Sequence, residues 1–140
     1  MQPRIFALTI LAACAPLDAA AHGALAVGMP PDTAKGGVAI GISFDYDNRD
    51  DAKARALQEC RAYLDAPPET LELCKVVDVF AKPECLVIAR DTAPGMRGLG
   101  WSVGGRTAAT ELALARCAES AGDERKGACA VTDVRCDGER

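Results

Sequence analysis

The chain has 140 residues, of which 26% are charged and 4% are aromatic, and its formal net charge is −4 at pH 7. A chain of this length suits one domain with a modest core. It contains no run of basic residues and no stripe of basic and aromatic residues. Because binding to nucleic acid depends on concentrated positive charge, the composition argues against a nucleic-acid partner.

Residues 1–21 have the pattern of a signal peptide. A basic residue precedes a largely apolar run at residues 5–15, and residues 19–21 are three alanines of the kind found at a cleavage site. Cleavage after them makes His22 the first residue of a mature domain at residues 22–140. The apolar run is too short to span a bilayer as a helix, so we expect no transmembrane segment in the mature protein.

An alternative processing route is present in the same region. Residues 11–14 read Leu-Ala-Ala-Cys, which resembles the lipobox that precedes a lipidated cysteine and makes Cys14 the candidate for lipidation. Simple secretion explains the three alanines, whereas lipidation does not. We therefore expect a periplasmic or secreted protein, and a lipid-anchored envelope protein is the alternative.

The first part of the domain predicts two strands, a helix and a third strand. Residues 24–27 are an apolar segment between glycines, and residues 38–44 carry apolar side chains on one face, as a half-buried strand does. Asn48 is a favourable N-cap for a helix whose buried stripe is rich in alanine. Two prolines end this helix, and the valine-rich residues 75–80 predict the third strand.

The chain contains an internal duplication, because residues 41–60 return as residues 98–117 when the two segments are aligned without a gap. The alignment matches Gly41 with Gly98, Arg49 with Arg106, Ala52 with Ala109, Ala56 with Ala113, Leu57 with Leu114 and Cys60 with Cys117, and it places Phe44 opposite Trp101. A Cys-x-Val-x-Asp-Val motif follows each copy, at residues 74–79 and 129–134. Such a pattern indicates one structural unit used twice.

The second part of the domain predicts the same order of elements. Strands are expected at residues 85–89, 97–103 and 130–136, and a helix is expected at residues 106–120, followed by Gly122 as its stop. Repeat one covers about 23–81 and repeat two about 85–136. We therefore expect an α+β fold, a single domain in which two strand-strand-helix-strand repeats share one sheet and one core and are stabilised by disulfides.

The predicted mature domain contains an even number of cysteines: Cys60, Cys74, Cys85, Cys117, Cys129 and Cys136. In a short exported chain this indicates disulfides, and six cysteines allow fifteen pairings. The duplication favours Cys60 with Cys74 and Cys117 with Cys129, because each pair brackets the same loop of its repeat. Cys85 and Cys136 then remain for each other.

Few side chains in the domain suit catalysis. The single histidine, His22, lies at the predicted mature N-terminus. A terminal residue is not held in a fixed orientation beside a nucleophilic serine or cysteine, as catalysis of that kind requires. Asp78 and Asp133 occupy equivalent strand positions and are the candidates for paired acid-base carboxylates, but hydrogen bonding to neighbouring backbone explains them more simply. We therefore assign no catalytic residue.

No metal or cofactor site is predicted. The cysteines are too widely spaced for a zinc-thiolate site. The acidic residues 45–51 lack the glycine and the glutamate of a calcium loop, and helix capping explains them. The glycines between residues 95 and 105 lack the spacing of a phosphate-binding or dinucleotide-binding loop.

The two aromatic residues Phe44 and Trp101 are expected to fill the core between helix and sheet. A partly exposed Trp101 would instead be a candidate interface residue, because tryptophan is enriched where proteins contact one another.

With these motifs, the chain resembles the bacterial secreted family catalogued as domain of unknown function 4189. The resemblance rests on the export signal, the repeated glycine-aromatic strand, the alanine-rich helices that contain residues 56–60 and 113–117, and the repeated Cys-x-Val-x-Asp-Val motif. It implies a small exported protein. The family has no general activity assigned to it, so the resemblance provides no catalytic residues for this chain.

We expect an exported, non-enzymatic binding or interaction module with an unidentified protein partner and no cofactor. An alternative of the same class is an inhibitor of a secreted hydrolase, for which the loop at residues 65–73 is the candidate insert. The contrasting alternative is a small enzyme that depends on the carboxylates of Asp78 and Asp133.

Overall fold

Both repeats contain the expected order of strands and helices. The computed structural model describes residues 21–94 and 98–137. Repeat one consists of β1 (His22–Gly28), α1 (Thr33–Gly36), β2 (Ala39–Tyr46), α2 (Arg49–Arg61), α3 (Pro68–Leu71) and β3 (Lys75–Ala81). Repeat two consists of β4 (Cys85–Asp91), β5 (Leu99–Gly104), α4 (Arg106–Ala121), the 3-10 helix η1 (Lys126–Ala128) and β6 (Cys129–Cys136). The predicted α+β class and the two-repeat architecture are confirmed.

The strands form two antiparallel sheets, with the order β2-β1-β3 in one and β5-β4-β6 in the other. The expectation of one sheet shared by both repeats is therefore wrong. Each first strand, β1 or β4, has the other two strands of its own repeat on its two sides. Neither central strand therefore has a free edge at which a strand of the other repeat could pair. The two repeats pack against each other through the faces of their sheets.

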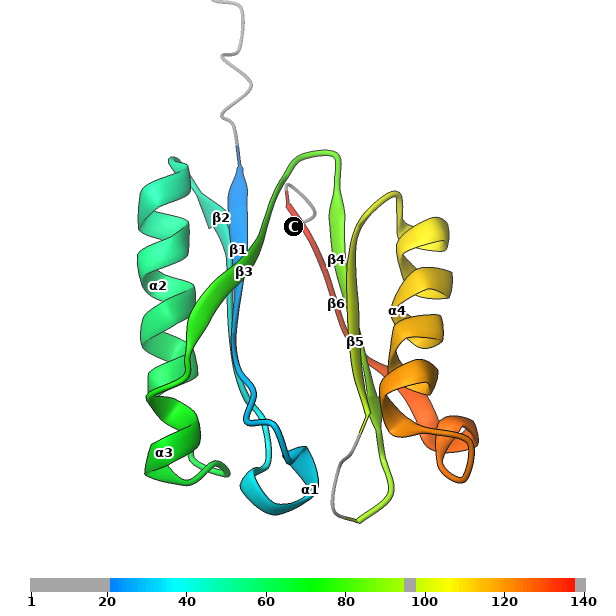
Figure 1. Cartoon of the computed structure of the whole chain (residues 1–140). Coiled ribbons are helices and arrows are strands. Elements are labelled where there is room, and N and C mark those ends of the chain that lie inside the picture. The colour runs from blue at the N-terminus through cyan, green and yellow to red at the C-terminus, as the bar shows by residue number, and fades with distance from the viewer. Residues whose placement is uncertain (1–20, 95–97, 138–140) are drawn as a thin grey trace, which may run out of the picture.

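The molecule has four layers in the order helix, sheet, sheet, helix, with α2 outside the first sheet and α4 outside the second (Figure 1). A shared core lies between the sheets and is formed by Leu25, Val27, Val38, Ile40, Phe80, Leu86, Ile88 and Leu99. A smaller cluster lies under each helix and consists largely of alanine, valine and cysteine. The shared core agrees with the sequence prediction, and the two helix-sheet clusters are additional to it.

Glycine in β2 and in β5 allows each helix to lie against its sheet. A Cβ atom added to Gly41 would lie 2.0 Å from the carbonyl oxygen of Ala56, and one added to Gly100 would lie 2.1 Å from that of Ala113. Gly41 is therefore equivalent to Gly100 and not to Gly98. The ungapped alignment holds for the helices, but the turn before α4 is two residues shorter than the turn before α2.

This shift changes the partners of the aromatic residues. Gly41 and Gly100 face the helices, so the residues that follow them, Ile42 and Trp101, face the opposite sheet and pack against the shared core. Phe44 is 46% exposed, and the guanidinium carbon of Arg135 lies 5.6 Å from the centre of its ring. The prediction that Phe44 and Trp101 fill the core between helix and sheet is therefore wrong.

A β-bulge explains the repeated Cys-x-Val-x-Asp-Val motif. Leu25 pairs with Asp78 and Ala26 with Val76, which leaves Val77 without a partner in β1, and the same irregularity occurs between β4 and β6. The extra residue places both Val76 and Val79 on the helix side of the sheet. A strictly alternating strand could not place two valines three residues apart on one face.

Each helix is tied to the third strand of its own repeat. Within the described residues, disulfides join Cys60 to Cys74, Cys117 to Cys129, and Cys85 to Cys136. The first two are the pairs that the duplication favours, and the third is the pair that remained by elimination. The first two connect α2 to the start of β3 and α4 to the start of β6, and the third crosses between the paired strands β4 and β6.

Candidate binding pocket at the edge of the sheet interface

A pocket of about 540 Å³ lies at one side of the interface between the sheets, and its walls are formed by Val27, Met29, Leu73, Lys75, Val77 and Trp101. Val27 belongs to the shared core, and both Val77 and Trp101 pack against that core. The pocket is therefore an opening into the apolar space between the two sheets. Its volume lies in the range of sites that hold a small molecule or a large side chain.

The pocket walls are apolar except for one cation, Lys75. Met29 is 41% exposed, Leu73 is 45% exposed, and Trp101 is half-buried. Lys75 is exposed and forms no ion pair with any residue in the part of the chain that the structure describes. An apolar group with an acidic group next to it would match this arrangement.

Regular elements and a disulfide hold the pocket walls in place. The preceding Gly100 contacts α4, and the carbonyl oxygen of Trp101 accepts a hydrogen bond from Nη1 of Arg116 at 2.6 Å. On the opposite wall, Leu73 and Lys75 flank Cys74, which is joined to Cys60 of α2. The pocket therefore exists in the folded chain without rearrangement, which reduces the entropy lost on binding.

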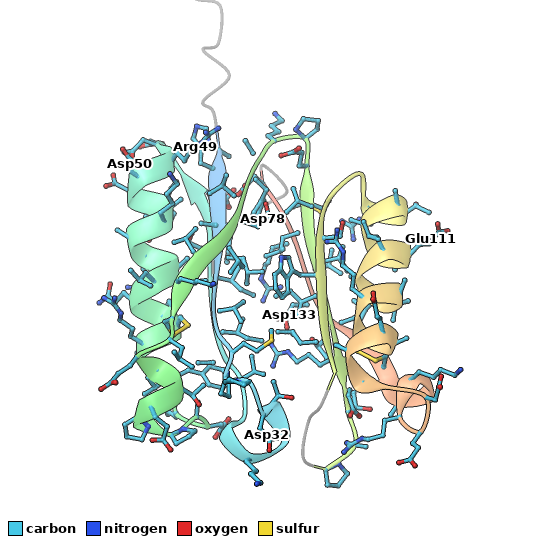
Figure 2. The ribbon with its side chains drawn as sticks, in the orientation of Figure 1. Asp32, Arg49, Asp50, Asp78, Glu111 and Asp133 are labelled. Carbon is cyan, nitrogen blue, oxygen red and sulfur yellow. A yellow bond between two sulfur atoms is a disulfide. The ribbon has the colours of Figure 1, made fainter. Side chains whose placement is uncertain are left out.

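The equivalent aspartates Asp78 and Asp133 have different partners. An oxygen of Asp78 accepts a hydrogen bond from the backbone N–H of Val79 at 3.0 Å, as the simpler explanation predicted. Asp133 instead receives a hydrogen bond from Nη2 of Arg90 at 3.0 Å and lies 3.8 Å from Nη2 of Arg135. Figure 2 shows the two aspartates at different levels along the sheets, and they do not share a common partner.

A buried carboxylate that the sequence did not reveal lies at the end of β6. Asp137 is only 2% exposed, and its Oδ1 accepts a hydrogen bond from the backbone N–H of Asp45 at 2.8 Å. Burial raises the pKa of Asp137 above 3.8, and the nearby charge of Asp45 adds to this effect. The hydrogen bond from Asp45 and the charge of His22 oppose the rise but do not cancel it.

The stability of the Asp137→Asn variant, relative to that of the native chain, is expected to increase as the pH rises. A raised pKa means that the folded state prefers the protonated carboxyl, so ionisation costs stability. This cost is absent below the unfolded pKa of 3.8, increases as the pH passes through the raised folded value, and is complete above it. Asparagine removes the cost and keeps an oxygen that can accept from Asp45.

The measurement is the melting temperature of the variant minus that of the native chain, at pH 3 and at pH 7. The difference should be higher at pH 7. Asp47→Asn removes the same charge at an exposed position and is the control. A difference that falls between pH 3 and pH 7 would contradict the assignment.

The acidic segment at residues 45–51 caps a helix. The side chain of Asn48 accepts a hydrogen bond from the backbone N–H of Asp51 at 2.9 Å, which is the predicted N-cap. Asp45 adopts a left-handed conformation with φ of 61°. Within residues 21–94 and 98–137, no three histidine, cysteine, aspartate or glutamate side chains come together in an arrangement that suits a metal ion.

The loop at residues 65–73 is partly fixed to the body of the molecule. It contains α3, in which Thr70 is fully buried and its hydroxyl donates a hydrogen bond to the carbonyl oxygen of Gly36 at 2.7 Å. Its end contributes Leu73 to the pocket beside Trp101. The predicted signal peptide and Cys14 lie outside the described residues.

The comparison with family models decides the family. Residues 22–136 match the model described as "Domain of unknown function (DUF4189)". The chain belongs to this family. The DUF4189 match extends from β1 to β6 and so includes both repeats, which confirms the family predicted from the sequence. Comparisons with curated proteins and with solved structures found no match.

The disulfides of this DUF4189 domain fit an extracellular or periplasmic protein, because such bonds persist in oxidising compartments. None of the helices in the described ranges is long and apolar enough to cross a membrane. Sequence reasoning identified Trp101 as a candidate interface residue if exposed. It missed Met29, Leu73 and Lys75, because no local pattern relates these three positions to Trp101.

Proposed function

We propose that this DUF4189 protein is a non-enzymatic binding module that acts in the periplasm or outside the cell, and that it binds a protein partner through the pocket beside Trp101. The pocket carries this proposal. It combines a half-buried tryptophan with two exposed apolar side chains, Met29 and Leu73, on a rigid, disulfide-linked frame. Tryptophan is among the residue types that provide most of the binding energy in protein interfaces, and the exposed apolar side chains beside it would exclude water from the contact.

The chemistry of the pocket favours a particular kind of contact. An apolar side chain of the partner would occupy the space between Val27, Val77 and Trp101, which is continuous with the shared core. An acidic residue next to that side chain would pair with Lys75, which has no described ion-pair partner. Such a pair at the rim of an interface contributes more to specificity and association rate than to affinity.

Export of the domain is part of this proposal. Residues 1–21 are proposed to be removed as a signal peptide, and both β1 and the matched region begin at His22. The alternative is lipidation at Cys14. The mass of the protein isolated from its native membrane and soluble fractions distinguishes them, since cleavage before His22 leaves no acyl group.

The carboxylate-dependent enzyme is the weaker alternative. Two carboxylates that share acid-base work normally act on the same substrate from a common site. Asp78 and Asp133 instead interact with different groups, and Asp133 is engaged by two arginines. The hydrolase-inhibitor alternative remains a form of the binding proposal, because Leu73 at the end of its candidate loop also lines the pocket.

The test is affinity capture from envelope and culture-medium extracts, followed by calorimetry with each purified partner. Trp101→Ala is expected to weaken binding by about 30-fold, which corresponds to about 2 kcal/mol for a central interface residue. The double variant Met29→Ala, Leu73→Ala should also weaken it, and it alters only exposed side chains. Leu112→Ala removes an equally exposed leucine from α4 and should bind as the native chain does.

Equal binding by all of these variants would contradict the assigned surface. Catalytic turnover that is lost in Asp78→Asn or Asp133→Asn, with folding intact, would contradict the non-enzymatic function.

A further inference from the structure

The two repeats differ at the outer edge of their second strands. β2 is an edge strand of the first sheet and β5 is an edge strand of the second. Such a strand has a row of backbone N–H and C=O groups that point away from its sheet and are free to pair with another chain unless something covers them. Because the two repeats have the same architecture, the edge of β2 can be compared directly with the edge of β5.

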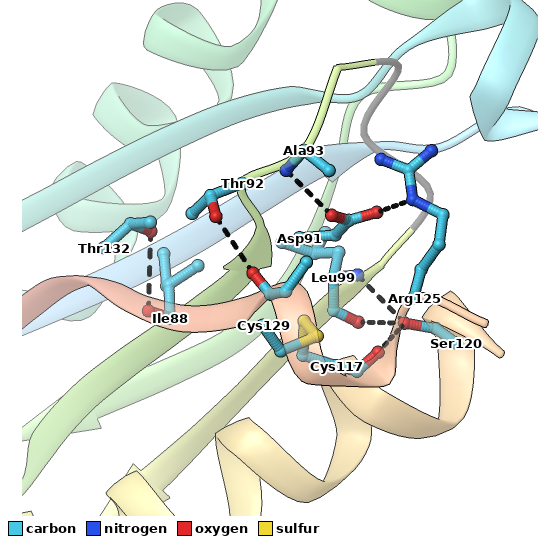
Figure 3. The surroundings of a disulfide bond; sticks show 11 residues. Ile88, Asp91, Thr92, Ala93, Leu99, Cys117, Ser120, Arg125, Cys129 and Thr132 are labelled. Atoms are coloured by element: carbon cyan, nitrogen blue, oxygen red, sulfur yellow. Dashed lines mark hydrogen bonds and ion pairs between the residues drawn. A yellow bond between two sulfur atoms is a disulfide. The ribbon is translucent and has the colours of Figure 1, made fainter. Parts of the chain in front are cut away.

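Side chains from α4 cover the edge of β5. The hydroxyl of Ser120 accepts a hydrogen bond from the backbone N–H of Leu99 at 2.9 Å and lies 3.0 Å from the carbonyl oxygen of Leu99 (Figure 3). Two residues further along, Nη1 of Arg116 donates to the carbonyl oxygen of Trp101 at 2.6 Å. Both outward groups of Leu99 and the outward carbonyl oxygen of Trp101 are therefore satisfied within the molecule.

The edge of β2 lacks these caps. Ile40 and Ile42 are equivalent to Leu99 and Trp101, because Val27 pairs with Ile40 as Arg90 pairs with Leu99, and Leu25 pairs with Ile42 as Ile88 pairs with Trp101. The N–H and C=O groups of Ile40 and Ile42 therefore also point outward. No side chain among the described residues forms a hydrogen bond with them.

The residues of α2 explain the difference. Fifty-seven positions before Arg116 and Ser120 stand Glu59 and Tyr63. A carboxylate cannot donate a hydrogen bond to a carbonyl oxygen, and Glu59 is paired with Arg55 on its own helix. Tyr63 lies beyond the end of α2, so it does not occupy the place of Ser120 on the last turn of α4.

A groove of about 420 Å³ follows this uncovered edge and is lined by Ile40, Gly41, Ile42, Glu59, Ala62, Tyr63, Leu64, Asp65 and Arg90. Leu64 is 95% exposed, which is unusual for a large apolar side chain beside a groove. Asp65 is exposed and forms no ion pair with a described residue. The groove thus combines free main-chain groups with an apolar and an acidic side chain.

We propose that β2 binds an extended segment of a partner protein by strand addition, with a basic residue of that segment near Asp65 and an apolar residue against Leu64. The backbone groups of Ile40 and Ile42 would pair with the segment, and the groove side chains would select its sequence. This site is distinct from the pocket beside Trp101, which lies at β3 and β5, so it extends the proposed function to a second contact surface.

A partner segment fits this edge better than a second copy of the chain. Glu59 and Arg90 of the groove are each held in an ion pair within the chain, so Asp65 is the groove charge left for a partner, and antiparallel pairing of β2 with β2 of another copy would add a second unpaired carboxylate to the contact. The net charge of −4 adds to this repulsion. A basic segment has the complementary charge.

Amide hydrogen exchange measured by NMR on the free protein provides the first test. The amides of Ile40 and Ile42 should exchange about 100-fold faster than that of Leu99, which is bonded to Ser120. Comparable protection at these three amides would overturn the proposal, because the edge of β2 would then be covered.

The second test uses a twelve-residue synthetic peptide of alternating valine and threonine with one central lysine, and a matched peptide with glutamate in its place. The lysine peptide, at millimolar concentration, should shift the amide signals of Ile40 and Ile42 and bind several-fold more tightly than the glutamate peptide. Two results would overturn the proposal. One is the absence of shifts at β2 when the peptide is added. The other is a dimer of the chain that forms through β2 as the protein concentration rises, in place of binding to the peptides.

Two variants make the assignment specific. Glu59→Arg places an arginine at the position that Arg116 has in repeat two and so transfers that cap to β2, and it should weaken the lysine peptide at least about 10-fold, as expected when main-chain pairing is blocked. Asp65→Lys should reverse the preference between the two peptides. Glu69→Arg makes an equal charge change on α3 outside the groove and should leave binding unchanged. Native-like binding of the lysine peptide by the Glu59→Arg variant would overturn the proposal.

Discussion

Replacing Gly41 with alanine is expected to lower the free energy of unfolding by about 3 kcal/mol or more, which is the upper range for an overpacked interior. The added Cβ atom would lie 2.0 Å from the carbonyl oxygen of Ala56 and 2.2 Å from the backbone nitrogen of Cys60. Both are backbone atoms of α2, so no side chain can rotate to relieve the contact. The helix itself must move away from the sheet.

Gly100→Ala should have a similar effect on repeat two, because its Cβ atom would lie 2.1 Å from the carbonyl oxygen of Ala113 and 2.4 Å from the nitrogen of Cys117. Urea unfolding followed by circular dichroism measures both losses. Gly127→Ala is the matched control, since nothing lies within 4 Å of a Cβ atom built there. A Gly41→Ala protein as stable as the Gly127→Ala protein would contradict the close helix-sheet approach.

Removing the bridge between Cys85 and Cys136 by changing both residues to alanine is expected to lower the free energy of unfolding by about 4 kcal/mol. The bridge spans 51 positions, so its loss frees a long loop in the unfolded chain. The local bridges span 14 and 12 positions, and the loss of either should cost about 3 kcal/mol by the same reasoning. For a domain of this size, each loss is a large part of the net stability.

Urea unfolding without reductant measures these differences, and the same experiment with all bridges reduced is the control. Once the native chain is also reduced, it and each double-alanine variant should unfold at nearly the same urea concentration. A difference that persists after reduction would show that packing of the cysteine side chains, and not the covalent link, provides the stability.

Much of the fold follows from short-range patterns. The cap at Asn48, the stop at Gly122 and the alanine stripe of each helix depend on residues within a few positions of one another, and the helices begin and end near the predicted residues. The cysteine pairing depends on the duplication, which places two cysteines around the same loop in each copy. These features could be predicted because each is set by local conformation or by the repeat itself.

The candidate sites depend on longer-range geometry. A turn two residues shorter in repeat two moves Trp101 to the position of Ile42, and the strand pairing and the contacts of Gly41 and Gly100 with the helices reveal that shift. The pocket then combines β1, β3, β5 and two connecting segments. No sequence spacing relates these segments, because their meeting depends on how two sheets pack.

By itself, the sequence determined the two repeats, the class of the fold, the family and the cysteine pairs. Only the tertiary structure decided that each repeat forms its own sheet, that Phe44 is exposed, that Asp137 is buried, and that the edge of β5 is covered while that of β2 is not. The physical reason is that periodicity specifies which face of a strand is apolar. The neighbour that covers that face or edge is chosen by contacts between distant residues.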